Sequence, residues 1–154
     1  MELPKPGPFH SRLAALVGTW IGEEKMFPSP WAPQGMTASV RIVNRSACGG
    51  FWVVGDYEQR VGGAVSFEGH SVYGYDAARD EVVLHWFDSM GLGPDVFRGR
   101  FEGMTLTAQC TNPAGTHRLT HELGRPGEYV TRMETSADGD TWRLMLEGTY
   151  RRQA

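Results

Sequence analysis

The chain has 154 residues, of which 40% are hydrophobic and 21% charged, and its formal net charge at pH 7 is −3. This length predicts one domain over residues 1–154. Its basic residues are scattered rather than gathered in the patch that nucleic acids require, so we expect no nucleic-acid partner. No run approaches the roughly 20 apolar residues that cross a bilayer, and the first residues lack the apolar core of a secretory signal. A cytoplasmic protein without a membrane partner is expected.

The two cysteines are expected to be free thiols. Cys48 and Cys110 lie far apart and show no Cys-x-x-Cys spacing. Reduced cysteines are the rule in a chain without a secretory signal, and a disulfide between these two is the alternative. The sequence shows no recognisable metal set, so neither a metal nor a cofactor is expected.

Only the beginning of the chain carries a helical pattern. Residues 1–8 are rich in proline and are expected to form a leader arm. Apolar side chains then recur at helical spacing from Phe9 to Val17, and Gly18 ends the pattern. A short N-terminal helix is therefore predicted.

Beyond Gly18 the hydrophobic period changes from 3.6 to 2, which is typical of strands. Turn residues separate the strands, and Asp138-Gly139 is the most specific of them because a tight hairpin needs positive φ there. Consecutive hairpins without helical cover favour a closed barrel over a sandwich, since closure removes the sheet edges. The fold class is thus all-β, a single closed antiparallel barrel of about ten strands at 19–27, 35–45, 50–60, 65–75, 80–88, 94–101, 104–111, 115–123, 127–136 and 140–151.

Two of these strands show a particularly regular alternation, typical of a sheet with one wet face. In the eighth, His117 and His121 share a face with apolar neighbours. In the last, one face is expected to hold Trp142, Leu144, Leu146 and Tyr150.

Several motifs resemble those of known families. Gly18-Thr19-Trp20 resembles the Gly-x-Trp signature of calycin-like barrels. A longer set of motifs is similar to the DUF1579 family of bacterial proteins over about residues 12–152: Phe67–His70, Val72–Asp76, Trp86–Met90, and Asp138-Gly139 with Tyr150-Arg151. The resemblance implies a lipocalin-like barrel of about ten strands and implies no activity.

The calycin resemblance also implies a structural contact. In such barrels the early tryptophan packs against an arginine near the chain end, and the matching residues here are Trp20 with Arg151 or Arg152. Stacking of this kind contributes about 0.5–2 kcal/mol.

Asp88 is the best single candidate for a functional carboxylate. It shares a strand face with Trp86, while His85 and Phe87 lie on the opposite face. A carboxylate beside an indole at the lip of an apolar cavity could act as a general acid or base. It could equally accept backbone hydrogen bonds and shape the glycine-rich loop that follows. Arg98 is its candidate partner or an anchor for an acidic ligand group.

His117 and His121 are not predicted to hold a metal together. On a strand their four-residue spacing places them about 13 Å apart, which metal–nitrogen bonds of about 2 Å cannot bridge. They are interpreted as pocket-lining or hydrogen-bonded core histidines. Ser71 is also excluded as a nucleophile, because Gly69–Gly74 lacks the spacing and the strand-to-helix turn of a nucleophile elbow.

The leading hypothesis for function is binding of a small apolar or amphipathic ligand inside the barrel. Polar anchors would be Asp88, Arg98, His117 and His121. Trp31, in a proline-rich loop, is expected either to close the mouth or contact a partner, or else to pack on the rim. The apolar lining is expected from Trp52, Tyr57, Tyr73, Trp86, Phe97 and Tyr129.

Other function classes remain open. An enzyme would use Asp88 with His85, His117 or His121 for proton transfer on a small substrate. Some related barrels bind haem through a C-terminal histidine, but residues 142–154 contain none, so His117 or His121 would have to serve. A filled barrel could instead act through its surface, and a homodimer is a possible assembly.

Overall fold

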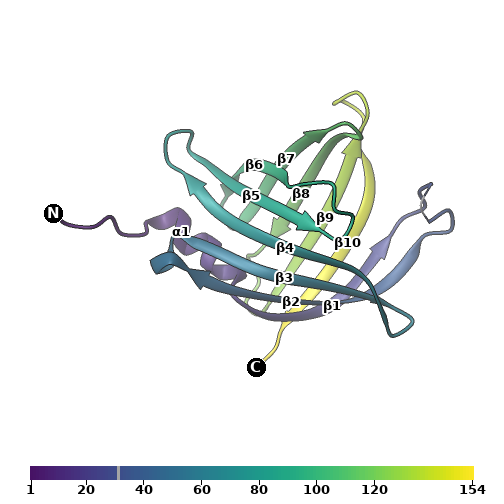
Figure 1. Cartoon of the computed structure of the whole chain (residues 1–154), viewed down its shortest axis with the longest axis horizontal. Coiled ribbons are helices and arrows are strands. Elements are labelled where there is room, and N and C mark those ends of the chain that lie inside the picture. Colours follow the sequence, from purple (N-terminus) through teal and green to yellow (C-terminus); the bar gives the residue numbers. More distant parts are fainter. Residues whose placement is uncertain (31) are drawn as a thin grey trace.

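The computed structural model describes residues 1–30 and 32–154 (Figure 1). Trp31, with its expected role at the mouth, lies outside the described residues. Two short helical segments, α1 (Pro8–Leu13) and η1 (Ala14–Leu16), precede the strands, and a 3₁₀ turn, η2 (Cys48–Gly50), follows the second strand. The strands are β1 (Gly18–Met26), β2 (Met36–Ala47), β3 (Trp52–Val61), β4 (Ala64–Asp76), β5 (Glu81–Asp88), β6 (Asp95–Glu102), β7 (Thr105–Asn112), β8 (Gly115–Glu122), β9 (Glu128–Ser136) and β10 (Arg143–Arg152).

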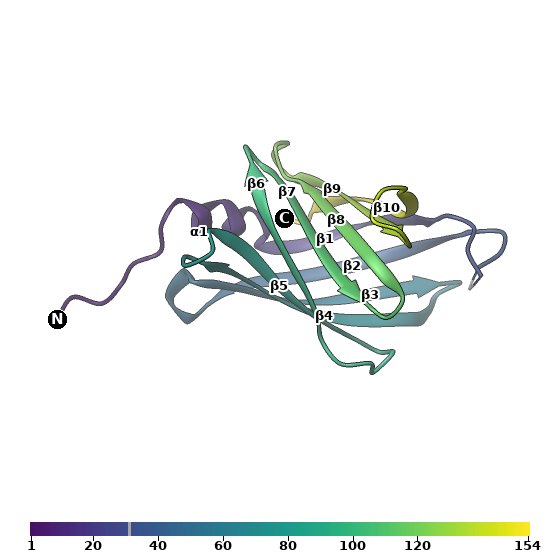
Figure 2. The same ribbon diagram turned by 90° about the horizontal axis from the view of Figure 1, so that it is seen from above.

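The ten strands form one closed antiparallel barrel. Each strand pairs with its neighbour in the chain, and β10 pairs with β1 to complete the ring, as Figures 1 and 2 show. Closure leaves no sheet edge open to another chain. The predicted fold class, a closed antiparallel barrel of about ten strands behind a short N-terminal helix, is confirmed.

The strands form where apolar and polar residues alternate. In β2, Ala38, Val40 and Ile42 are buried, while Ser39 and Arg41 between them are exposed. Alternate side chains of a strand point to opposite faces of the sheet. The same alternation around the ring gives an apolar interior and a charged exterior.

One end of the barrel, which we call the helix end, is closed by α1 and η1. Leu13 and Leu16 are at most 1% exposed and belong to the core. The carbonyl oxygen of Leu16 accepts hydrogen bonds from Trp20 Nε1 at 2.9 Å and from Asn44 Nδ2 at 3.0 Å. Phe9 stacks on Tyr75 with ring centroids 4.5 Å apart. These contacts fix the helix over the ends of β1, β2 and β4.

The opposite end, which we call the far end, carries the β1–β2, β3–β4, β5–β6, β7–β8 and β9–β10 connections. β4 and β5 meet the helix end at Asp76 and Glu81, so Asp88, the last residue of β5, lies at the far end. The sequence also predicts Asp88 at a lip of the barrel interior.

A β-bulge in β10 corrects the predicted alternation of that strand. Leu146 pairs with Met133, but Leu144 pairs with Glu134, because the register shifts between Leu144 and Leu146. Leu144 therefore lies on the outer face with Glu134 rather than on the inner face with Tyr150. An inserted residue inverts every side chain beyond it.

Arg152 covers Trp20 at the helix end. Its guanidinium carbon lies 4.4 Å from the centroid of the indole ring, and its nitrogens donate to the carbonyl oxygens of Val17 and Ala15. Gly18 has φ +139° and a Cβ there would lie 2.7 Å from the Arg152 guanidinium, which explains the glycine of the Gly-x-Trp motif. Arg151 instead lies 3.6 Å from a Glu128 carboxylate oxygen.

We expect Arg152→Ala to lower the free energy of unfolding by about 1–2 kcal/mol, because it removes a cation–π contact and two helix-capping donors. Arg151→Ala is the matched control. Its side chain is 78% exposed, so the loss should stay below about 0.5 kcal/mol. Urea denaturation of both variants measures the difference, and equal losses would contradict a sealing role for Arg152.

Candidate functional site

The interior toward the far end is lined by side chains that are only partly buried. They share strand faces with fully buried core residues, so they point inward. Deeper in the barrel, toward the helix end, Tyr73, Phe97, Tyr129 and Tyr150 are at most 7% exposed. The partly buried inner residues are Tyr57, Phe67, Trp86, Asp88, Asp95, His117 and Met133.

Trp86 is held against the inner wall by three neighbours. A Cβ on Gly69 would lie 2.2 Å from the indole ring, so the ring rests directly over that glycine. Asp88 Oδ2 accepts a hydrogen bond from Trp86 Nε1 at 2.8 Å. Tyr57 meets the ring edge to face, with centroids 5.6 Å apart, and Phe67 meets Tyr57 at 6.2 Å. We call Tyr57, Phe67 and Trp86 the aromatic wall.

Glu24 lies beneath the aromatic wall and is 2% exposed. Tyr57 OH donates to its Oε2 at 2.5 Å, Tyr150 OH to its Oε1 at 2.5 Å, and Gln59 Nε2 to Oε2 at 3.2 Å. Burial raises the pKa of the Glu24 carboxyl above its usual value, and the hydrogen bonds from Tyr150, Tyr57 and Gln59 oppose that rise in part. These four residues form a closed polar group inside an otherwise apolar barrel.

Small residues make room for this polar group. Glu24 pairs with Gly148 on one side and Ala38 on the other. A Cβ on Gly148 would lie 2.4 Å from Tyr150 OH and 2.9 Å from Glu24 Cγ. The absence of a side chain at Gly148 therefore lets the phenol reach the carboxylate.

His121 occupies a second buried polar chain. Tyr73 OH lies 2.9 Å from its Nε2 and Thr131 Oγ1 lies 2.8 Å from its Nδ1. Burial lowers the pKa of His121 to about 4, so the imidazole is neutral at pH 7. Tyr129 packs edge to face against it, with centroids 5.6 Å apart. The structure places His121 and Tyr73 inside the barrel as hydrogen-bonded core residues.

His117 lies nearer the far end, in a chain of side-chain hydrogen bonds. Its Nε2 is 3.1 Å from Asn112 Oδ1, and Asn112 Nδ2 donates to Asp95 Oδ1 at 3.3 Å. Asn112 Oδ1 also accepts from Ala114 N at 2.9 Å, which fixes the orientation of the amide. Because an amide oxygen can only accept, His117 donates through Nε2.

Three of the residues expected to line a site face outward instead. Trp52 precedes the buried Val53 and is 38% exposed; it lies over Gly74 on the outer surface. His85 and Arg98 lie on the outer faces of β5 and β6, because the residues beside them in each strand point inward. The Arg98 guanidinium is 3.4 Å from Asp76 and 3.6 Å from Glu81. None of these three lines the interior, because the strand alternation turns them away.

This placement also separates the proposed catalytic pair. Asp88 points inward and accepts hydrogen bonds from Trp86 Nε1 and from Met90 N at 3.0 Å. His85 lies on the other face of β5, as the alternation predicts, so of the three histidines named for proton transfer only His117 and His121 share the interior with Asp88. The inward-facing candidates are Tyr57, Tyr73, Trp86, Asp88, Phe97, His117, His121 and Tyr129.

Sequence reasoning missed Glu24, Gln59 and Tyr150 as interior polar residues. The signal was present for Glu24, since Trp20 and Glu24 are four residues apart on one predicted strand and must share a face. A charged residue in a strand is normally assigned to the wet face, and that assumption conceals a buried carboxyl.

The described residues offer no metal-binding cluster, and His121 has no free ring nitrogen for haem. Within residues 1–30 and 32–154, no three His, Cys, Asp or Glu side chains come together in a way that would hold a metal ion. Both ring nitrogens of His121 are engaged by Tyr73 and Thr131, which leaves none for iron.

The two cysteines, Cys48 and Cys110, are free, so the alternative of a disulfide is wrong. Among the described residues, no helix has the length and apolarity needed to traverse a bilayer.

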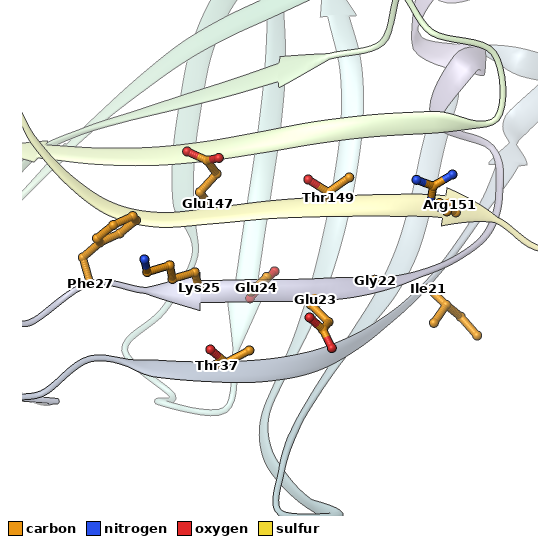
Figure 3. A pocket seen from close by; sticks show the side chains of 10 residues that line it. All are labelled: Ile21, Gly22, Glu23, Glu24, Lys25, Phe27, Thr37, Glu147, Thr149 and Arg151. Carbon is orange, nitrogen blue, oxygen red and sulfur yellow. The ribbon is translucent and has the colours of Figure 1, made fainter.

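The outer surface carries a shallow depression over β1, β2 and β10 (Figure 3). Its rim includes Glu23 and Lys25 from β1 and Glu147 and Arg151 from β10, which bring charges of both signs. A surface of mixed charge selects no ligand class, and none of the predicted site residues lies there. The interior is therefore the better candidate site.

Comparison with known proteins decides the family. A family model described as a protein of unknown function, DUF1579, matches residues 5–152. The chain belongs to this family. The match covers nearly the whole length and agrees with the motifs that resembled DUF1579. No curated protein matches this DUF1579 chain.

Two solved structures share the fold of this DUF1579 barrel. Rv2717c from M. tuberculosis is 15% identical, with a TM-score of 0.73, covering 96% of this chain and 99% of its own. The S-type phycobiliprotein lyase CPES from Guillardia theta is 12% identical, with a TM-score of 0.64, covering 95% and 91%. At these identities the likeness concerns the fold alone.

Proposed function

We propose that this protein binds a small amphipathic molecule in the far-end interior, with the apolar part of the ligand against the aromatic wall. The observation that carries the proposal is that the Trp86 side chain is partly exposed and yet held in place. Its indole is only partly buried, yet Gly69, Asp88 and Tyr57 fix it in one position. An aromatic surface held rigid before binding loses little conformational entropy when a ligand packs on it.

The composition around Trp86 matches that of small-molecule sites. Such sites are mostly apolar and supplied with a few placed polar groups. Here Tyr57, Phe67 and Met133 are apolar or aromatic, and Asp88 supplies a polar group beside them. The same fold occurs in a phycobiliprotein lyase.

Binding is better supported than proton transfer by Asp88. Both Asp88 oxygens already accept hydrogen bonds, from Trp86 Nε1 and from Met90 N, which is the arrangement of a carboxylate that positions its neighbours. The enzyme hypothesis paired Asp88 with a histidine, and within the described part of the chain no histidine hydrogen-bonds to Asp88.

Two tryptophans give a matched test. Trp86 and Trp52 each cover a glycine of β4, the first inside the barrel and the second outside. Titration with 2-(1-naphthyl)ethanol, followed by calorimetry, should show that Trp86→Leu weakens binding about tenfold or more through loss of aromatic contact. Trp52→Leu should leave the affinity within about twofold, because Trp52 faces solvent.

Native mass spectrometry of the freshly purified protein supplies the second measurement. A retained mass of a few hundred daltons per chain would reveal the natural ligand directly. Circular dichroism should show that both tryptophan variants are folded. If Trp86→Leu and Trp52→Leu then reduce the affinity for the naphthyl alcohol equally, a site inside the barrel is contradicted.

A further inference from the structure

We infer that the ligand is a cation, an amphipathic amine or quaternary ammonium compound, rather than an acid. This inference rests on the proposed binding function and concerns its specificity. Three observations support it: the carboxylates that face the far-end interior, the outward direction of most lysines and arginines, and the aromatic wall beside the carboxylates.

The inward-facing charged side chains beside the aromatic wall are carboxylates. Asp88 follows Trp86 on the same face of β5, and Asp95 pairs with Trp86 across β5 and β6. Trp86 Nε1, Met90 N and Asn112 Nδ2, which donate hydrogen bonds to them, are all neutral groups. A carboxylate has about four lone-pair positions, so both residues retain capacity to accept.

The loops at the far end reinforce this charge. The connections at 27–35, 62–63, 89–94, 113–114 and 137–142 contain no lysine or arginine, and the last contains Asp138 and Asp140. Charges of one sign around an entrance raise the local concentration of ligands of the opposite sign. These loops favour a cation over an anion at the far end, and Arg143 is the inward-facing charge that opposes them.

Most basic residues of the strands lie outside the barrel. Arg98, Arg118 and Arg132 form ion pairs with acidic residues on the outer surface, and Lys25 and Arg41 alternate with inward residues. Arg152 covers Trp20 at the helix end, and Arg143 is the inward-facing basic residue among the described strand residues of the far end. It begins β10, is exposed, and pairs with Thr135, which in turn pairs with His117. β10 lies across the ring from β5, so Arg143 stands on the wall opposite Trp86.

The aromatic wall suits a cation for a second reason. Indole and phenol rings attract ammonium and guanidinium groups through their electron-rich faces, by about 0.5–2 kcal/mol per contact, and several rings together bind quaternary ammonium ions. Trp86, Tyr57 and Phe67 stand side by side, and Asp88 adjoins the indole. An ammonium group bound beside the indole would lie close to the aromatic wall and to the Asp88 carboxylate.

Three probes with one apolar body test the inference: 2-(1-naphthyl)ethylamine, 2-(1-naphthyl)ethanol and 1-naphthylacetic acid. Calorimetry at pH 7 and low salt should rank the amine first and the acid last, with about tenfold or more between them. Asp88→Asn and Asp95→Asn should each reduce the amine-to-acid ratio about threefold or more. Asp56→Asn, whose carboxylate is 82% exposed on the outer face, should leave the ratio unchanged.

The outcomes separate the two proposals. If the alcohol binds through Trp86 while the acid binds as tightly as the amine, the cationic ligand is overturned and the binding function stands. If the acid binds best and Arg143→Gln abolishes that binding, the site takes anions at the rim and the inference is again overturned. If none of the three probes binds, the binding function itself fails and the inference fails with it. Thermal melts of every variant confirm that losses reflect the site rather than unfolding.

Discussion

Glu24→Ala is expected to lower the free energy of unfolding by about 3–5 kcal/mol. The substitution leaves the hydroxyls of Tyr57 and Tyr150 and the amide of Gln59 without the acceptor that they share. Each buried donor that loses its partner costs about 1–3 kcal/mol, and the side chain also leaves a void between β1 and β10. Urea denaturation at pH 7 measures the loss.

Glu23 supplies the control, because it is the adjacent residue on the opposite, exposed face of β1. Glu23→Ala should change stability by less than about 0.5 kcal/mol. Glu24→Gln keeps the shape and one acceptor oxygen, so its loss should be intermediate. A Glu24→Ala variant as stable as the Glu23→Ala variant would show that the buried hydrogen bonds do not support the fold.

The pH dependence of stability gives Glu24 a second signature. The pKa of Glu24 is raised in the folded protein, so over the range above its unfolded value of about 4.5 the folded state binds more protons than the unfolded state. The contribution of Glu24 to the free energy of unfolding is therefore complete below the pKa that Glu24 has in the unfolded chain. It is lost as the pH rises through the higher pKa of Glu24 in the folded protein. Glu24→Gln should remove this loss.

The fold could be predicted from sequence because the barrel depends on local patterns that repeat. Alternation marked the strands, and turn residues such as Asp138-Gly139 marked their ends. The pairing of Trp20 with a C-terminal arginine also appeared in the motif resemblance, and the structure selects Arg152 over Arg151. These features need no knowledge of which strand lies beside which.

The facing of individual residues could be predicted only where a strand is strictly alternating. Residues 51–54 are all apolar, Phe-Trp-Val-Val, so nothing in the sequence says whether Trp52 or Val53 points inward. A shift of one residue inverts the answer, and the structure turns Trp52 outward. The bulge beside Leu144 inverts the facing in β10 for the same reason.

The polar interior was the hardest part to predict because it depends on contacts between distant strands. Glu24 is buried only because Tyr57 and Tyr150, on β3 and β10, reach it with their hydroxyls. Tyr150 is 126 residues away in the sequence. A buried carboxyl without such partners would be costly, so the partners had to be known before burial could be inferred.

His121 provides the second large effect, an acid-induced loss of stability. Burial lowers its pKa from 6.5 to about 4, so between these values the unfolded chain binds a proton that the folded protein does not. Stability therefore falls as pH decreases from 6.5 toward 4. A pKa shift of this size lowers the free energy of unfolding by about 3 kcal/mol once the pH is below the pKa of His121 in the folded protein. Urea denaturation at intervals between pH 7 and pH 4 measures it.

His121→Gln should flatten this acid limb while lowering stability at pH 7, because the amide cannot reproduce both hydrogen bonds to Tyr73 and Thr131. His70→Gln is the control, since His70 lies exposed on the outer face, and it should keep the acid limb. Glu24 acts in the opposite direction as pH falls, so the His121 effect should be clearest in a Glu24→Gln background. An acid limb that persists unchanged in His121→Gln would assign the loss to another group and would remove the case for a neutral, buried imidazole.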